Sequence, residues 1–182
     1  MANRTGGCLC GAVRYELSGR AQMDLSCYCR DCQYVSGGGP AHAIVMLAKE
    51  VKTTKGEPKE YWTVSAKGRR VARIFCDKCS TPLFARNEKL PEYLAVKVGS
   101  LDDPTVFEPQ ANIWTKSAQP WHHLDAAISR FKENPELGAR AIFEFFRSSA
   151  VKLGRLIRKR GDSSAAGEAQ DKGFRSERPE KD

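Results

Sequence analysis

Hydrophobic and polar residues alternate along several short segments in the first 125 residues of the chain. The segment 12–17 has the two-residue period of a half-buried strand, and the apolar run 41–47 is typical of a more fully buried one. Three more segments are rich in β-branched and aromatic residues, which favours strands: 61–65, 71–75 and 93–98. Turn-forming Gly, Pro and Asp residues separate these segments. The pattern predicts a mainly β fold for this part.

The periodicity changes near Asn134, which can cap a helix that has Pro135 at its first position. Apolar residues then recur at helical spacing as far as Ile157, and Gly161 is a natural stop signal. We therefore expect an amphipathic helix over residues 135–160. Residues 161–182 are rich in Ser, Ala, Gly, Glu, Lys and Arg, with Phe174 as the one aromatic residue, and we expect them to be disordered.

Positive charge is concentrated on this expected helix. The chain has a formal net charge of +8, and residues 139–160 hold seven basic side chains and one acidic one. A helix with a basic face and an apolar stripe is typical of segments that lie on anionic membranes, and basic patches also bind nucleic acid. Amphipathic helices of soluble proteins more often bury their apolar stripe, so packing on the β domain or pairing with a second copy of the chain is the favoured interpretation. A membrane surface, nucleic acid and a homo-oligomer all stay open as partners.

Two observations concern the compartment. The longest uninterrupted apolar run, at 43–48, is far shorter than the roughly 20 residues of a membrane-spanning helix. The residues before Cys8 contain no apolar segment of the kind found in a secretory signal. We therefore expect a cytoplasmic protein.

The chain contains seven cysteines, all before residue 80. An odd number disfavours a disulfide framework, and a reducing cytosol keeps thiols free. The cysteines are closely spaced, as Cys8-x-Cys10, Cys27-x-Cys29-x-x-Cys32 and Cys76-x-x-Cys79. Two thiolates in one tight turn can reach a shared zinc ion about 2.3 Å from each sulfur. The spacing favours two zinc ions per chain.

Seven cysteines divide naturally into a group of four and a group of three. The two outer pairs would form a closed structural site from Cys8, Cys10, Cys76 and Cys79. The central group would supply three ligands, Cys27, Cys29 and Cys32, and three protein ligands with one open position are the pattern of a catalytic zinc. A histidine could instead close this second site, and the candidates are His42, His122 and His123.

Five sequence blocks resemble, in order, the glutathione-dependent formaldehyde-activating enzyme (GFA) and centromere protein V domain family. They are GGCLCGAVRYE from Gly6, CYCRDC from Cys27, FCDKCSTPLF from Phe75, GSLDDP from Gly99, and the Ile113-Trp114 to Trp121 segment. The resemblance covers residues 5–124. It implies a zinc-containing β-tent of packed antiparallel sheets over residues 5–125, with a structural zinc on the group of four and a catalytic-type zinc on the group of three. It also implies a carbon–sulfur lyase that condenses formaldehyde with glutathione to S-(hydroxymethyl)glutathione.

Three positions depart from the family pattern. Tyr28 and Asn112 stand where the family often has His, and Ser80 stands where it usually has Gly. None of the three is a zinc ligand in this scheme.

The charge of a three-thiolate zinc site indicates its chemistry. Zinc with three thiolates carries a net formal charge of minus one, so it is a poorer Lewis acid than zinc bound by three histidines. It is better suited to bind an external thiol, lower the pKa of that thiol and hold it as a nucleophile for an aldehyde. The proton donor could be His42, Tyr28 or water. A non-catalytic, zinc-stabilised binding module is the alternative function.

A thiol substrate with carboxylates would need cations and a pocket. Arg30 lies within the central cysteine group, and one predicted hairpin carries Lys67, Arg69, Arg70 and Arg73. Trp114 and Trp121 could line a pocket. The alternatives are a solvated charged face and aromatic core residues.

Overall fold

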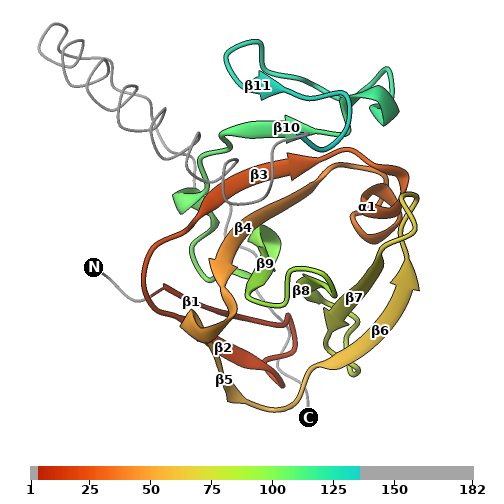
Figure 1. The fold of residues 1–182 in the computed structure, drawn as a ribbon. Helices are drawn as coiled ribbons and strands as arrows, with labels where there is room; N and C mark the ends of the chain where they lie inside the picture. Colours follow the sequence, from red (N-terminus) through yellow and green to blue (C-terminus); the bar gives the residue numbers. More distant parts are fainter. Residues whose placement is uncertain (1–3, 136–182) are drawn as a thin grey trace, which may run out of the picture.

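The computed structural model describes residues 4–135, which form two β-sheets (Figure 1). The smaller sheet is antiparallel and has the order β1-β2-β5. Its strands are β1 (Arg4–Gly7), β2 (Arg14–Leu17) and β5 (Val51–Lys55). The larger sheet has the order β11-β10-β3-β4-β9-β8-β7-β6. Its strands are β3 (Met23–Cys27), β4 (Ala41–Leu47), β6 (Lys59–Val64), β7 (Arg70–Phe75), β8 (Pro82–Asn87), β9 (Tyr93–Lys97), β10 (Ala111–Ile113) and β11 (Ser129–Arg130).

Helical structure in the described part of the chain is short. The α-helix is α1 (Arg30–Val35), and the 3-10 turns are η1 (Ala48–Glu50), η2 (Val98–Ser100), η3 (Pro104–Val106) and η4 (Thr115–Ser117). Among residues 4–135 no helix is long and apolar enough to cross a bilayer. The expected helix 135–160, apart from its first residue, and the tail 161–182 lie outside the described residues.

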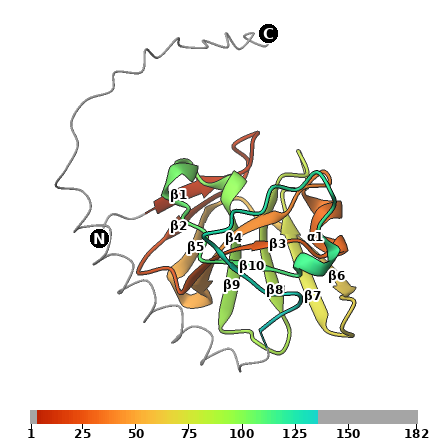
Figure 2. The same cartoon turned by 90° about the horizontal axis from the view of Figure 1, so that it is seen from above.

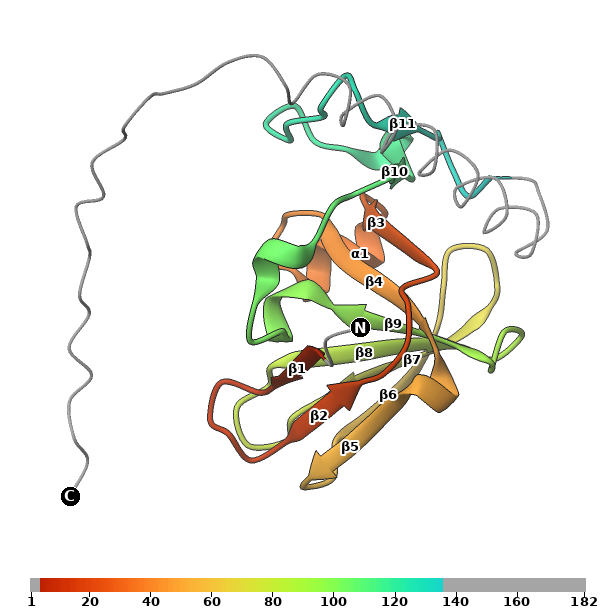
Figure 3. The same cartoon turned by 90° about the vertical axis from the view of Figure 1, so that its left-hand side faces the viewer.

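The mainly β prediction is confirmed, but the sheets are not wholly antiparallel. Strand β10 pairs in parallel with both β3 and β11. A parallel pair needs a long crossover connection, and here the chain from β4 to β9 separates β3 from β10. The resulting edge, with β10 and β11, lies farthest from the smaller sheet (Figure 3).

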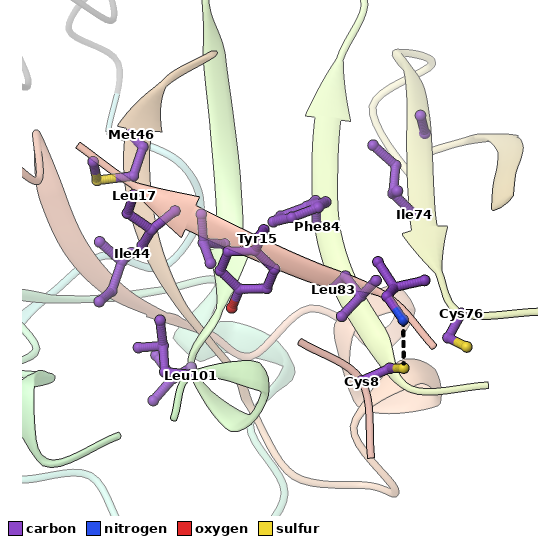
Figure 4. Packing of buried hydrophobic residues seen from close by; sticks show 14 residues of the cluster. Cys8, Tyr15, Leu17, Ile44, Met46, Ile74, Cys76, Leu83, Phe84 and Leu101 are labelled. Carbon is purple, nitrogen blue, oxygen red and sulfur yellow. Dashed lines mark hydrogen bonds between the residues drawn. The ribbon is translucent and has the colours of Figure 1, made fainter. Parts of the chain in front are cut away.

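The core lies between the inner face of the larger sheet and the smaller sheet. Strand register aligns Ile44, Val96, Phe84 and Ile74 across four strands, and all four are buried. They belong to one apolar cluster with Tyr15 of β2, whose ring meets that of Phe84 at 4.9 Å (Figure 4). Burying such apolar surface is the main stabilising contribution to a fold of this kind.

The opposite, outer face of the larger sheet carries a different set of side chains. Successive residues in a strand point to opposite faces, so register fixes which residues share one. Ala41 pairs with Cys27 and Ala43 with Lys97, and the row Ala95–Ala85–Arg73–Tyr61 continues on the same face. The outer face therefore brings together Cys27, Lys97, Arg73 and Tyr61 from β3, β9, β7 and β6. Helix α1 follows β3 and lies toward the β6–β7 side of the sheet (Figures 1 and 2).

Candidate metal centres

Four cysteine sulfurs meet where a turn of the smaller sheet faces a turn of the larger one. Cys8 and Cys10 lie between β1 and β2, and Cys76 and Cys79 lie between β7 and β8. All four Sγ atoms lie within 4.8 Å of one another. The Cys10 and Cys76 sulfurs are 3.8 Å apart although 66 residues separate them in sequence. The cluster therefore links the two sheets.

Each turn places its pair by a tight backbone reversal. The Gly11 N–H donates to the Cys8 carbonyl at 3.0 Å, and the Ser80 N–H donates to the Cys76 carbonyl at 2.9 Å. Both donors are in the left-handed region, with φ of 70° at Gly11 and 58° at Ser80. Gly reaches this region without strain, whereas Ser does not.

Hydrogen-bond donors lie next to the sulfurs of Cys8 and Cys79. The Val13 N–H donates to the Cys8 sulfur at 3.2 Å (Figure 4). The Thr81 hydroxyl lies 3.1 Å from the Cys79 sulfur. The contact with Thr81 lowers the pKa of Cys79 to about 6. Donors of this kind favour thiolates, which are the form that binds metal. Four sulfurs at this separation fit a closed tetrahedral zinc site.

The second cluster draws all three sulfurs from one short segment. Cys27 ends β3, Cys29 precedes α1 in extended conformation, and Cys32 lies in the first turn of α1. Their Sγ atoms lie within 4.8 Å of one another. Cys27 is buried, and the other two are partly exposed. The strand-to-helix turn thus presents three ligands in one direction.

The ionisation of these three thiols shows how well the group suits a cation. Hydrogen bonds from Cys27 and Cys32, with the positive charge of Arg73 as a smaller cause, lower the pKa of Cys29 to about 2. Cys29 and Cys32 in turn raise the pKa of Cys27, and burial adds to the effect. Three sulfurs this close together disfavour ionisation of all three thiols without a cation. A divalent cation would allow all three to ionise, so the donor set fits zinc.

The buried side chain of Gln33 holds this turn in place by hydrogen bonds. Its side chain is 1% exposed, and its amide donates to the carbonyls of Tyr28 at 2.6 Å and Ser117 at 2.7 Å. Its oxygen accepts from Arg30 and, at 3.3 Å, from Gln119. A buried amide with all these partners fixes the cysteine turn relative to η4.

A cavity of 440 Å³ lies between α1 and strands β6 to β9 of the larger sheet. Tyr34 and Val35 line it from α1, whereas Tyr61, Arg73 and Lys97 line it from β6, β7 and β9. Among the residues given above as candidate cations, Arg73 alone lines this cavity. Lys67 pairs with Glu133 and Arg70 with Glu88.

The histidines do not join the three-cysteine cluster. Within residues 4–135, no histidine nitrogen lies within 4.8 Å of all three sulfurs. His42 contacts the Ser26 hydroxyl at 2.8 Å, on the face of β4 opposite to Ala41. His122 accepts from the Gln119 N–H at 3.0 Å, so its other nitrogen carries the proton and donates to the Gly38 carbonyl at 2.9 Å. Both rings thus have local partners.

Comparison with known proteins shows the family of the chain. The family model described as glutathione-dependent formaldehyde-activating enzyme (GFA) matches residues 3–117. The chain belongs to the GFA family. The chain is also similar to a solved Rhodobacter sphaeroides protein, with 20% identity and a TM-score of 0.44 over 70% of this chain and 98% of that one. No curated protein matches the sequence.

The positions that depart from the GFA pattern lie away from the cavity walls, with one exception. Tyr28 is buried, and its hydroxyl donates to the His123 carbonyl at 3.3 Å. Asn112 is also buried, in β10. Ser80 is the exception, since it lines the 440 Å³ cavity as well as closing the Cys76–Cys79 turn.

The two tryptophans and Lys67, which the sequence offered as pocket residues, do not line the 440 Å³ cavity and make other contacts. Trp114 donates to Asn134 at 2.8 Å, with Lys67 and Lys116 over its ring, and Trp121 is 74% exposed beside His122. Lys97, Tyr34 and Tyr61 line the cavity without having been expected there. The two-residue alternation of β6 and β9 could have placed Tyr61 and Lys97 on one face, but only if the strand register were known.

Proposed function

We propose that this GFA-family protein is a zinc-dependent carbon–sulfur lyase that joins a glutathione-like thiol to a formaldehyde-like aldehyde and also cleaves the adduct. The observation that carries the proposal is the cluster of Cys27, Cys29 and Cys32, which has no fourth protein ligand among residues 4–135. The helix that carries Cys32 also supplies Tyr34 and Val35 to the cavity wall. Three protein ligands are typical of zinc sites that bind a substrate atom. The four-sulfur cluster supports a second, structural zinc.

Bound zinc would lower the pKa of the incoming thiol at the three-cysteine site. In the condensation the thiol sulfur forms a bond to the carbonyl carbon, and the π electrons of the carbonyl move to its oxygen. The proton that the thiol loses balances the proton that the oxygen gains. The reverse reaction breaks the carbon–sulfur bond and releases the aldehyde.

The residues around the cysteines organise this chemistry. Gln33 holds the turn that bears the three thiolates, and Val35 and Tyr34 form one wall of the cavity. His42 lines a separate cavity of 320 Å³ and not the one of 440 Å³, and its Nδ1 lies 2.8 Å from the Ser26 hydroxyl. The Tyr28 hydroxyl is engaged by the His123 carbonyl. We therefore assign proton transfer to water in the cavity, which takes the thiol proton and supplies the hydroxyl proton.

The wider organisation follows from the same proposal. Residues 5–125 would form the zinc domain, with two zinc ions per chain. The protein would act in the cytoplasm, where glutathione keeps thiols reduced. A role for residues 135–160 in binding a membrane surface, nucleic acid or a second copy remains a separate proposal.

Exchange kinetics at equilibrium test the proposed reaction, because the uncatalysed condensation also occurs. Magnetisation transfer between carbon-13 formaldehyde hydrate and its glutathione adduct should accelerate in proportion to added protein. Cys29→Ser should abolish the acceleration, and Arg69→Gln, an exposed change in the β6–β7 turn, should not. If the zinc-loaded wild type leaves the exchange rate unchanged, the non-catalytic binding module becomes the better account.

A further inference from the structure

The 440 Å³ cavity is lined by two cationic side chains and by no anionic one. Arg73 and Lys97 both line it, and its lining contains no Asp or Glu. Both residues are half-buried, and neither side chain has a hydrogen bond or an ion pair within residues 4–135. Arg70 of the same hairpin instead pairs with Glu88 at 2.8 Å. Half-buried, unpaired cations on a cavity wall are a means of binding anions.

Strand register explains why these two cations, and not their neighbours, reach the cavity. Arg73 and Lys97 share the outer face of the larger sheet with Cys27. Arg70 belongs to the opposite face, where its guanidinium lies 5.0 Å from the centre of the Trp62 ring. The cations are therefore placed by the same alternation that places the first cysteine ligand.

The same register brings both cations toward the turn that carries the cysteines. Cys27 pairs with Ala41 and Lys97 with Ala43, so their partners are two residues apart on the same face of β4. Arg73 lines the cavity together with Tyr34 and Val35 of α1, the helix that also carries Cys32. A molecule held by Arg73 and Lys97 would thus lie next to the cysteine turn.

The space available suits an extended ligand. A second cavity, of 320 Å³, shares Val35, Pro82 and Lys97 with the first one. The two cavities therefore adjoin at Lys97. Exposed aromatic rings, Tyr34 and Tyr61, stand at the rim of the larger one. Volumes of this size are typical of sites for small organic molecules.

We infer that Arg73 and Lys97 form the carboxylate-binding part of the site and select thiols that carry carboxylates over neutral thiols. This inference rests on the proposed function, and it names the residues that choose the thiol. A bond between a cation and a carboxylate is stronger than a neutral hydrogen bond, so loss of either cation should weaken binding about tenfold.

The test separates carboxylate recognition from binding through sulfur. S-methylglutathione keeps both carboxylates of glutathione but has no thiol to ionise, and its binding to the zinc-loaded full chain can be followed by calorimetry. Arg73→Gln and Lys97→Gln should each raise its Kd about tenfold. Arg69→Gln removes the same charge from an exposed position in the same hairpin and should change the Kd less than about twofold. The diethyl ester of S-methylglutathione should bind weakly to all four proteins.

Three outcomes are possible, and each is decisive. Binding that weakens in both cavity variants, with thermal melting unchanged, supports the inference even if the exchange assay shows no catalysis. Equal binding by the wild type and both cavity variants overturns it, and so does a wild type that does not bind S-methylglutathione. Catalysis of glutathione exchange in that last case would leave the proposed function standing without this recognition site.

Discussion

The two cysteine clusters use the same ligand atoms but draw them from the chain in different ways. The group of four joins turns of two sheets, with 66 residues between Cys10 and Cys76. The group of three comes from one strand-to-helix turn, between Cys27 and Cys32. A metal held by distant segments closes a long loop and stabilises the fold, whereas a metal held by one local turn adds little to long-range order.

The surroundings of the two cysteine clusters differ as well. Cys8 and Cys76 are buried in the apolar cluster that holds the two sheets together. The three-cysteine turn is instead supported by the buried amide of Gln33, and the helix that follows it lines a cavity with two cations. The two clusters therefore differ in the placement of their ligands and not in ligand type, and the proposed division into a structural and a reactive site rests on that placement.

Removing one ligand from each cluster should give the largest difference. Cys76→Ser should prevent folding, because a structural zinc contributes on the order of 10 kcal/mol, comparable to the whole stability of a domain. Cys29→Ser should give a folded protein with weaker zinc binding at the second site. Zinc content and thermal melting measure both effects. If the two variants melt at the same temperature, the proposed division of roles is wrong.

Removing the support of the three-cysteine turn should have an intermediate effect. Gln33→Leu removes the side-chain donor to the Tyr28 carbonyl and the shorter of the two donors to the Ser117 carbonyl, at a cost of about 3 kcal/mol in the free energy of unfolding. Zinc should be lost from the second site before the first. Gln119→Leu, which removes longer contacts at 3.3 and 3.4 Å, is the matched control and should cost about 1 kcal/mol. Denaturant unfolding of both variants checks the difference, and equal costs would show that Gln33 is not the anchor.

The smallest change in the free energy of unfolding should come from substitutions at the two positive-φ positions in the turns of the four-cysteine cluster. Ser80 has a φ of 58°, so Ser80→Gly should raise the free energy of unfolding by about 1 kcal/mol. Gly11 has a φ of 70° in the corresponding turn, and Gly11→Ser should lower it by a similar amount. Chemical denaturation measures both. Shifts in the same direction would contradict a conformational origin.

The local patterns of the sequence predicted much of the strand content. The predicted segment 41–47 coincides with β4, and 71–75 matches β7 within one residue, because each combines local β-propensity with a clear boundary. Strand β1 (Arg4–Gly7) has two glycines and no apolar alternation, so its pairing with β2 depends on tertiary contacts. The parallel pairing of β10 likewise depends on the path of the chain between distant strands.

The cysteines were easier to predict than the cavity. Close spacing marks Cys27, Cys29 and Cys32 as a group because all three lie within one turn. Lys97 and Tyr61 line the same cavity only through the register of the larger sheet, which no local pattern specifies. Of the basic hairpin residues, only a knowledge of the sheet faces distinguishes Arg73 from Arg70.

In the proposed division of roles, one metal site is closed and the other accepts a thiol. Replacing zinc with cobalt makes each metal–thiolate bond visible as charge-transfer absorption, and seven cysteines contribute in the protein alone. Glutathione should add an eighth sulfur and raise the intensity by about one-seventh, whereas S-methylglutathione should leave it unchanged. An absorption that does not respond to glutathione in protein carrying two cobalt ions would contradict the claim.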